Sequence, residues 1–188
     1  MTKNIIIVGV GGQGTLLASR ILGNVALKLG YDIKVSEVHG MSQRGGSVTT
    51  YVKYGDCVHS PIVDRGEADI ILAFEILEAY RALPYLKKGG TIIANTQQIN
   101  PMPVITGASK YPENIPEKIS KNANLITIDA LKLAMEAGNI KVINIILIGV
   151  MARSMDIPYD IWVDVIRNTV PAKLLDVNLK AFDLGYGK

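Results

Sequence analysis

The segment Gly-Val-Gly-Gly-Gln-Gly, residues 9–14, most constrains what this chain can fold into. It follows the apolar run Ile5–Val8 and precedes Leu16–Ala18, so it lies between a candidate strand and a candidate helix. Glycines at this spacing allow a tight turn, a close approach of the backbone to a phosphate, and close packing of the helix on the strand. The free N–H groups at the start of the helix favour an anion. The sequence therefore predicts a strand–loop–helix unit that can receive a phosphate-bearing ligand.

Short runs rich in β-branched residues alternate with helical patterns along the chain. Strands are expected at residues 4–8, 33–38, 48–54, 70–74, 91–95 and 125–128, and helices at residues 15–29, 75–86, 129–137, 142–154 and 159–169. Strands separated by helices form a largely parallel sheet with helices on both faces. The predicted fold class is therefore α/β: a three-layer α/β/α, Rossmann-like domain with a mostly parallel, partly mixed sheet. Residues 1–188 are expected to form one such domain.

Two segments depart from this alternation. Nine residues without a helical pattern separate Val38 from Val48, which is too few for a parallel crossover, so the strand at 48–54 is expected to run antiparallel. Residues 99–117 hold four prolines and Gly107. That composition predicts an irregular excursion, with at most one short extended piece around Val104–Ile105.

Composition and charge exclude several classes of function. The 20 basic and 17 acidic residues are interspersed and give a net charge of +3, so no nucleic-acid partner is expected. The lone cysteine, Cys57, allows neither an intrachain disulfide nor a zinc or iron–sulfur site. The longest apolar stretch, residues 142–152, is too short to span a bilayer, and the first apolar run is unlike a signal sequence. We expect a cytoplasmic chain without membrane association. Because 48% of its residues are hydrophobic, part of them is expected to face another chain.

The glycine loop by itself leaves several ligands open. Glu37 follows Gly14 by 23 residues, near the place where the acid of a dinucleotide-binding fold contacts a ribose. A free-standing NAD(P)-dependent oxidoreductase and a nucleotide-sensing module are therefore alternatives, as is a tight turn that binds nothing. Against a complete dehydrogenase, the chain's only histidines are His39 and His59, and it has no Tyr-x-x-x-Lys pair after a strand.

A second motif follows the second predicted strand. Residues 37–47 read Glu-Val-His-Gly-Met-Ser-Gln-Arg-Gly-Gly-Ser, where the carboxyl ends of parallel strands gather ligands. Arg44 beside Gly45 and Gly46 places a permanent cation next to backbone that a ligand can approach closely, and Ser42 adds a hydroxyl. The alternative is a simple turn with a solvated arginine. Combined with the glycine loop, the motif predicts an anion pocket.

The two motifs together resemble a known family. With the segments GEADIILAFEILEA (66–79) and LKKGGTIIANT (86–96), they are similar to the gamma-type domain of the 2-oxoacid:ferredoxin oxidoreductases. The resemblance runs over residues 4–150 and continues more weakly through 178–186. Within that family, EVHGMSQRGG at 37–46 favours the beta subunits of the branch that oxidises indolepyruvate.

The resemblance implies a small subunit of an enzyme that oxidatively decarboxylates an aryl 2-oxoacid, with indolepyruvate favoured, to an acyl-CoA and reduces ferredoxin. Coenzyme A is the implied co-substrate. Thiamine diphosphate, Mg²⁺ and [4Fe-4S] clusters are implied on a larger alpha subunit in a heterodimeric unit, and none on this chain alone. The resemblance assigns no catalytic residue here. It implies that a cofactor-binding site is formed by Gly9, Gly11, Gly12, Gln13, Gly14, Ser42, Arg44, Gly45 and Gly46, with the Gln13 amide in the cleft and Arg44 on a CoA phosphate or the substrate carboxylate.

Other polar side chains in these regions have structural interpretations. Glu37 is expected to pair with nearby cations, and His39 to hydrogen-bond a turn. Glu75 and Glu78 lie where a helix dipole favours carboxylates without any chemistry. Cys57 is expected to be a buried packing residue.

Overall fold

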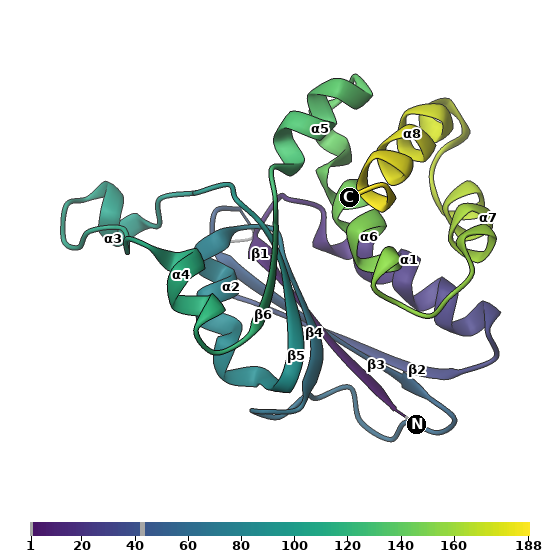
Figure 1. Ribbon diagram of the computed structural model, residues 1–188, viewed down its shortest axis with the longest axis horizontal. Coiled ribbons are helices and arrows are strands. Elements are labelled where there is room, and N and C mark those ends of the chain that lie inside the picture. The colour runs from purple at the N-terminus through teal and green to yellow at the C-terminus, as the bar shows by residue number, and fades with distance from the viewer. Residues whose placement is uncertain (1, 42–43) are drawn as a thin grey trace.

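The computed structural model describes residues 2–41 and 44–188, and its centre is a mixed β-sheet (Figure 1). The strand order in this part of the chain is β2-β3-β1-β4-β5-β6. The strands are β1 (Lys3–Val10), β2 (Asp32–His39), β3 (Ser47–Gly55), β4 (Ala68–Ala73), β5 (Leu86–Asn95) and β6 (Asn124–Ile128). All six predicted strands are confirmed, and so is the α/β class.

Helices cover both faces of the sheet (Figure 1). One layer contains α1 (Thr15–Lys28), α5 (Ala130–Ala137), α6 (Ile143–Arg153), α7 (Tyr159–Thr169) and α8 (Leu175–Tyr186). The other contains α2 (Ile76–Ala82) and α4 (Ile115–Ser120). The short α3 (Met102–Ile105) lies away from the sheet, on the excursion between β5 and α4.

Strand β1 contributes side chains to the cores on both faces of the sheet, because successive side chains of a strand point to opposite faces. Ile5 and Ile7 are fully buried in the core shared with α1, α6 and α8, whereas Ile6 and Val8 pack in the core under α2. This double burial explains the unbroken apolar run that precedes the glycine loop.

Strand β3 is antiparallel to both of its neighbours, as predicted. Strands β4, β5 and β6 continue parallel to β1. Because β3 reverses the direction between β1 and β2, those two strands point the same way. The carboxyl ends of β1, β2, β4, β5 and β6 therefore share one edge of the sheet, where β3 begins. We call this the ligand edge.

Two predicted elements are wrong in detail. Val104 and Ile105 are helical, not extended: both of their N–H groups donate to the Pro101 carbonyl, at 2.9 and 3.1 Å. The helix expected to run to residue 86 ends at Ala82, since Pro84 turns the chain through a 3-10 helix into β5.

Helix α8 was not predicted, and it packs against α6 through two glycines. A Cβ on Gly185 would lie 2.1 Å from the Ile146 carbonyl oxygen, and one on Gly149 would lie 2.4 Å from that of Phe182. Only hydrogen in place of a side chain permits backbones this close. Within the described ranges no helix, α6 included, is both long and apolar enough to cross a membrane.

Candidate functional site

The glycine loop is the turn between β1 and α1. Gly12 and Gly14 have φ values of 101° and 87°, a region that side-chain-bearing residues rarely adopt. Gly14 is the N-cap of α1, with no side chain capping the helix and no acid in its first turn. The N–H groups at the start of this 14-residue helix are therefore left for another acceptor.

Gln13 holds the loop against the sheet. Its Oε1 accepts the Val10 N–H at 2.7 Å, and its Nε2 donates to the Phe74 carbonyl at 3.1 Å and to Gln97 Oε1 at 3.3 Å. This amide was predicted to lie in the cleft for a ligand, but both of its polar atoms already bind the protein. Contact between Gln13 and a ligand stays a prediction.

The glycines at positions 9 and 14 are required by close neighbours. A Cβ on Gly9 would lie 3.0 Å from Phe74 Cβ and from Gln13 Oε1. A Cβ on Gly14 would lie 2.7 Å from Nδ2 of Asn144, a buried side chain on α6. Glycine at these two positions lets the loop sit tightly between β4 and α6.

The second motif lies beside the first. The Gly11 N–H donates to the Gly46 carbonyl at 2.8 Å, and the Gly45 N–H donates to the Gly11 carbonyl at 3.3 Å. These bonds continue the β1–β3 ladder, in which Val10 pairs with Ser47. Arg44 is exposed on this turn. Ser42, predicted to belong to the site, lies outside the described residues.

Residues of the two motifs line three cavities. The first, of about 450 Å³, is lined by Gly12, Gly14, Thr15, Leu16, Glu37 and His39. The second, of about 370 Å³, is lined by Gly12, Gln13, Gly14, Gln97, Ile99, Ile140, Lys141 and Ile143. The third, of about 230 Å³, is lined by Val10, Gly45, Gly46, Ser47, Leu77, Glu78, Arg81, Ile99, Pro101 and Met102. The first two cavities adjoin the glycine loop, and the third adjoins Gly45 and Gly46.

Glu37 and His39 face the first of these cavities from the end of β2. The Glu37 carboxylate accepts the Thr50 hydroxyl at 3.2 Å across the sheet. His39 Nδ1 lies 2.9 Å from the Gly40 carbonyl oxygen, which is the turn hydrogen bond expected from the sequence.

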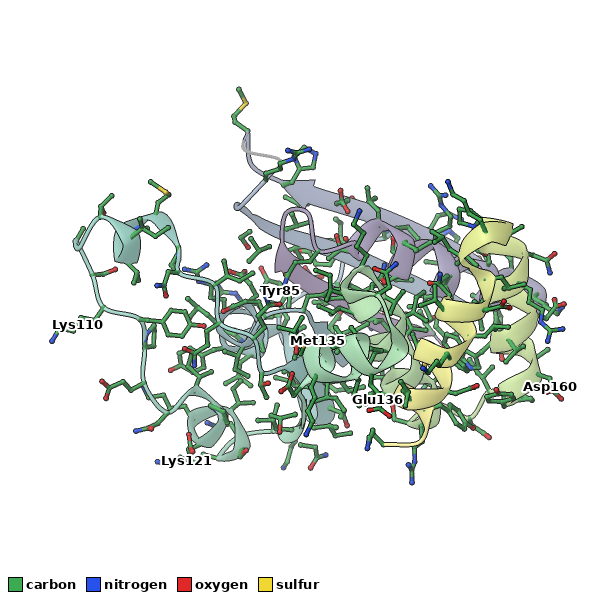
Figure 2. All side chains as sticks on the ribbon, turned by 90° about the horizontal axis from the view of Figure 1, so that it is seen from above. Tyr85, Lys110, Lys121, Met135, Glu136 and Asp160 are labelled. Atoms are coloured by element: carbon green, nitrogen blue, oxygen red, sulfur yellow. The ribbon has the colours of Figure 1, made fainter. Side chains whose placement is uncertain are left out.

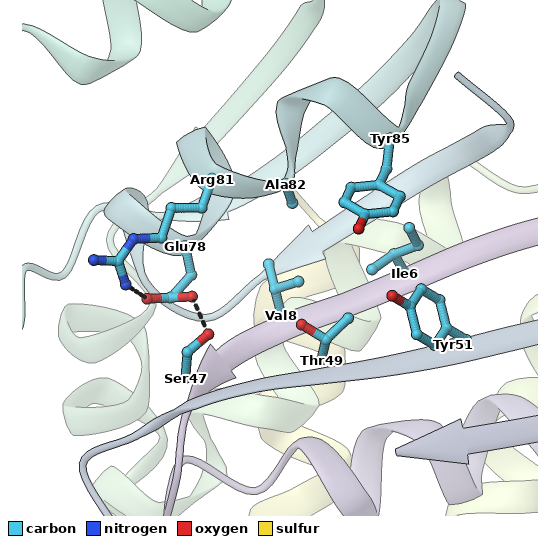
Figure 3. Close-up of a pocket in the computed structure, with 9 residues that line it drawn as sticks. All are labelled: Ile6, Val8, Ser47, Thr49, Tyr51, Glu78, Arg81, Ala82 and Tyr85. Carbon is cyan, nitrogen blue, oxygen red and sulfur yellow. Dashed lines mark hydrogen bonds and ion pairs between the residues drawn. The ribbon is translucent and has the colours of Figure 1, made fainter. Parts of the chain in front are cut away.

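Glu78 and Arg81, which were not predicted as part of the site, join Ser47 in a polar chain that lines both the third cavity and the separate pocket drawn in Figure 3. The Ser47 hydroxyl donates to Glu78 Oε2 at 2.6 Å, and Arg81 Nη1 donates to Glu78 Oε1 at 2.6 Å. Glu78 is only 5% exposed, so it receives two hydrogen bonds in place of water. It links the start of β3 to α2 and bonds Arg81, which lines the same cavity as Gly45 and Gly46.

The chain's own residues do not fit an iron–sulfur cluster. Cys57 is the sole cysteine of the sequence, and it is exposed rather than buried as expected. Among residues 2–41 and 44–188 no three His, Cys, Asp or Glu side chains cluster in a way that could hold a metal ion.

A family model described as pyruvate ferredoxin/flavodoxin oxidoreductase matches residues 4–188. The chain belongs to this family. It is also 48% identical to the indolepyruvate oxidoreductase subunit IorB of Pyrococcus horikoshii, over 97% of this chain and 93% of that protein. This chain is accordingly a small subunit within the 2-oxoacid ferredoxin oxidoreductases, as the resemblance implied.

Solved structures of other family members share the fold. One is the gamma subunit of a keto/oxoacid ferredoxin oxidoreductase from Geobacter sulfurreducens, with a TM-score of 0.73, 22% identity, and coverage of 98% of this chain and 96% of that one. Another is the 2-oxoglutarate:ferredoxin oxidoreductase of Magnetococcus marinus, with a TM-score of 0.75 and 18% identity. There this chain matches 30% of a longer chain, over 99% of its own length. The same fold therefore occurs both as a separate subunit and within a larger polypeptide of the family.

Proposed function

We propose that this chain is the small subunit of a cytoplasmic oxidoreductase that oxidatively decarboxylates an aryl 2-oxoacid, with indolepyruvate the favoured substrate. In that reaction the 2-oxoacid and coenzyme A yield an acyl-CoA, CO2 and a proton, and a pair of electrons passes to ferredoxin. The 48% identity to a subunit named for indolepyruvate supports this choice of substrate.

The observation that carries the site assignment is the junction of the two motifs at the ligand edge. A hydrogen bond of 2.8 Å from the Gly11 N–H to the Gly46 carbonyl joins them, beside the N-terminus of α1, which no side chain caps. We assign this junction to the phosphates of coenzyme A. Backbone N–H groups and the end of α1 offer donors to an anion, and Arg44 adds a charge that is always present. The Magnetococcus relative was determined with coenzyme A bound, which supports this class of ligand.

Redox chemistry is assigned to a larger partner subunit. When bound there, thiamine diphosphate would supply the carbanion chemistry of decarboxylation and the clusters would supply the route for electrons. This chain would bind and orient coenzyme A, and would exclude water from the cleft. Its glycine loop contributes rigid backbone donors, because Gln13 ties it to the ends of β1 and β4.

Reconstitution tests the proposal. The chain is co-expressed with its larger subunit, and ferredoxin reduction is measured with indolepyruvate and coenzyme A, with each component omitted in turn. We expect activity only with both subunits, the 2-oxoacid and coenzyme A present. Equal activity of the larger subunit alone would refute the proposed role. Reduction of NAD(P)⁺ by this chain alone would instead support the free-standing dehydrogenase.

A further inference from the structure

The excursion between β5 and α4 projects from the body of the protein. We call residues 99–111 the arm. Figure 1 shows α3 at its far end, well apart from the sheet, and Figure 2 shows Lys110 at the outer margin of the molecule. Two large apolar side chains of the arm are open to solvent, Met102 at 66% and Ile105 at 65%. They are three positions apart on one helical turn, so they share a side.

Both ends of the arm are attached to one buried carboxylate. Glu75, only 1% exposed, is the N-cap of α2 and accepts the Glu78 N–H at 2.9 Å. Its other oxygen accepts the Ile99 N–H at 3.0 Å and the Tyr111 hydroxyl at 2.5 Å. Burial, followed by the bond to Glu75, raises the pKa of Tyr111 above its usual value. The phenol therefore stays protonated and remains a donor.

The arm is also held from within. The Ser109 N–H donates to the Pro103 carbonyl and the Thr106 N–H to the Met102 carbonyl, each at 2.9 Å. Pro101 and Pro103 restrict the backbone further. A segment fixed in this way loses little conformational entropy when it binds a partner.

The chemistry of the arm is that of an interface centre. Lys110 is its one charged residue, and charged residues are depleted at the centres of protein interfaces, where methionine is enriched. Met102 also lines the cavity that holds Gly45 and Arg81. Two further exposed apolar residues, Leu16 and Ile140, line the cavities on the other sides of the glycine loop. Exposed apolar side chains therefore recur from the arm along the ligand edge, beside the polar residues that line the same cavities.

We propose that the arm docks onto the larger subunit of the oxidoreductase, with Met102 and Ile105 inserted into an apolar groove of that subunit. The identity of this partner rests on the proposed function. A second copy of this chain fits the position less well: a symmetric contact through the arms would bring two ligand edges together and obstruct both. A larger subunit docked there would instead cover the cavity beside Gly45, and so complete the site only in the complex.

A competition within the complex tests the arm directly. Tagged larger subunit is co-expressed with equal amounts of two untagged small chains, the wild type and one variant. Native mass spectrometry then measures how much of each small chain is captured with the larger subunit. We expect Met102→Ser/Ile105→Ser to be outcompeted by about tenfold or more, the usual effect of removing interface anchors. The matched control is Leu27→Ser/Ile62→Ser. These residues are also exposed, at 58% and 46%, but lie near the opposite edge of the sheet, and this variant should be captured equally.

The soluble, uncaptured pool serves as the measure of folding for each variant. A second variant, Tyr111→Phe, keeps the ring but loses the bond to Glu75. It should show faster amide exchange in residues 99–110 and a smaller competitive loss than the double variant. Equal capture of arm variant and control would overturn the docking role while leaving the proposed function intact. Failure of the wild-type chain to be captured at all would overturn both. A wild-type homodimer that the arm substitutions dissociate would assign the arm to a second copy instead.

Discussion

Replacing Gln13 tests whether its amide supports the loop or contacts a ligand. In Gln13→Ala the Val10 N–H, bonded to Oε1 at 2.7 Å, loses its partner on a residue only 8% exposed. The Phe74 carbonyl keeps a second donor, Asn95 Nδ2 at 3.2 Å, so the main loss is at Val10. An unsatisfied buried N–H costs about 1–3 kcal/mol. For a chain of this size each kcal/mol lowers the melting temperature by about 2–4 °C, which predicts a fall of about 2–12 °C.

Gln13→Glu separates the bond that the side chain accepts from Val10 N–H from the bond that it donates to the Phe74 carbonyl. The introduced carboxylate can still accept from Val10 N–H but faces the Phe74 carbonyl without a proton to donate. The carbonyl oxygen therefore raises the pKa of that carboxyl in the folded state. A raised carboxyl pKa gives stability that is present at low pH and is lost as pH rises through the folded pKa. The deficit of this variant relative to wild type should thus be largest at neutral pH and shrink toward pH of about 4–5.

The assay is thermal and urea unfolding from pH 4 to pH 8, together with the KM for coenzyme A in the reconstituted complex. Gln98→Ala, which removes an exposed neighbouring glutamine, is the control and should leave both quantities unchanged. If Gln13→Ala has the same melting temperature as the wild type, the proposal that Gln13 supports the loop is refuted. A large rise in KM at unchanged melting temperature would instead place the amide on the ligand.

Four further outcomes are expected. Arg44→Ala should raise the KM for coenzyme A or the 2-oxoacid about ten- to a hundredfold, from the loss of a charge-assisted bond of about 1.5–3 kcal/mol, with Arg44→Lys recovering part; unchanged values for both would remove Arg44 from the site. Gly14→Ala should lower the free energy of unfolding by more than the about 1–2 kcal/mol that alanine costs in the left-handed region, because its Cβ would also meet Asn144. Adding Asn144→Ala should relieve part of this excess, as measured by urea unfolding. Burial raises the pKa of Tyr54 from 10.0 to about 12, so the folded chain keeps a proton that the unfolded chain loses; urea unfolding should show stability falling between these pH values, less so in Tyr54→Phe. The chain purified alone should be colourless and bind no thiamine diphosphate; a brown preparation with stoichiometric iron and sulfide would contradict the assignment of the clusters to the partner.

Strands were predictable because the sheet imposes a local pattern. Short β-branched runs bounded by polar or glycine residues mark β1 to β6, and the length of the 38–48 connection was enough to predict the direction of β3. Helix α1 was predictable from its three-four spacing of apolar residues. In each case the information lies within about a dozen neighbouring positions.

Helix α8 could not be found in that way. Its packing depends on Gly149 and Gly185, which are 36 positions apart in the sequence but each meet the backbone of the facing helix. In the sequence the first reads only as an interruption of an apolar run. Long-range contact, rather than local propensity, determines the close packing of α6 and α8.

Part of the candidate site was likewise predictable from local sequence, and part of it was not. The adjacency of residues 9–14 and 45–46 followed from strand ends that share an edge. The walls of the cavities, by contrast, come from separate elements: Arg81 from α2, Met102 from the arm and Lys141 from the turn before α6. No spacing rule links these positions to the glycine loop, so only the folded chain brings them together.

The topology also bears on which ligand the glycine loop selects. In a dinucleotide-binding fold the second strand lies next to the first, so an acid at its end is one strand spacing from the loop, about 4.8 Å. Here β3 lies between β1 and β2, and Glu37 is therefore displaced by two spacings, about 10 Å. The position beside β1 is taken by Gly45 and Gly46, with Arg44 next to them. Under the proposed function, a ligand at this position would meet the glycine turn and the Arg44 cation where a nicotinamide ribose would find a carboxylate. This arrangement is consistent with the proposed phosphorylated co-substrate, whereas a ribose hydroxyl bound as in a dinucleotide-binding fold would need a carboxylate one strand from the loop.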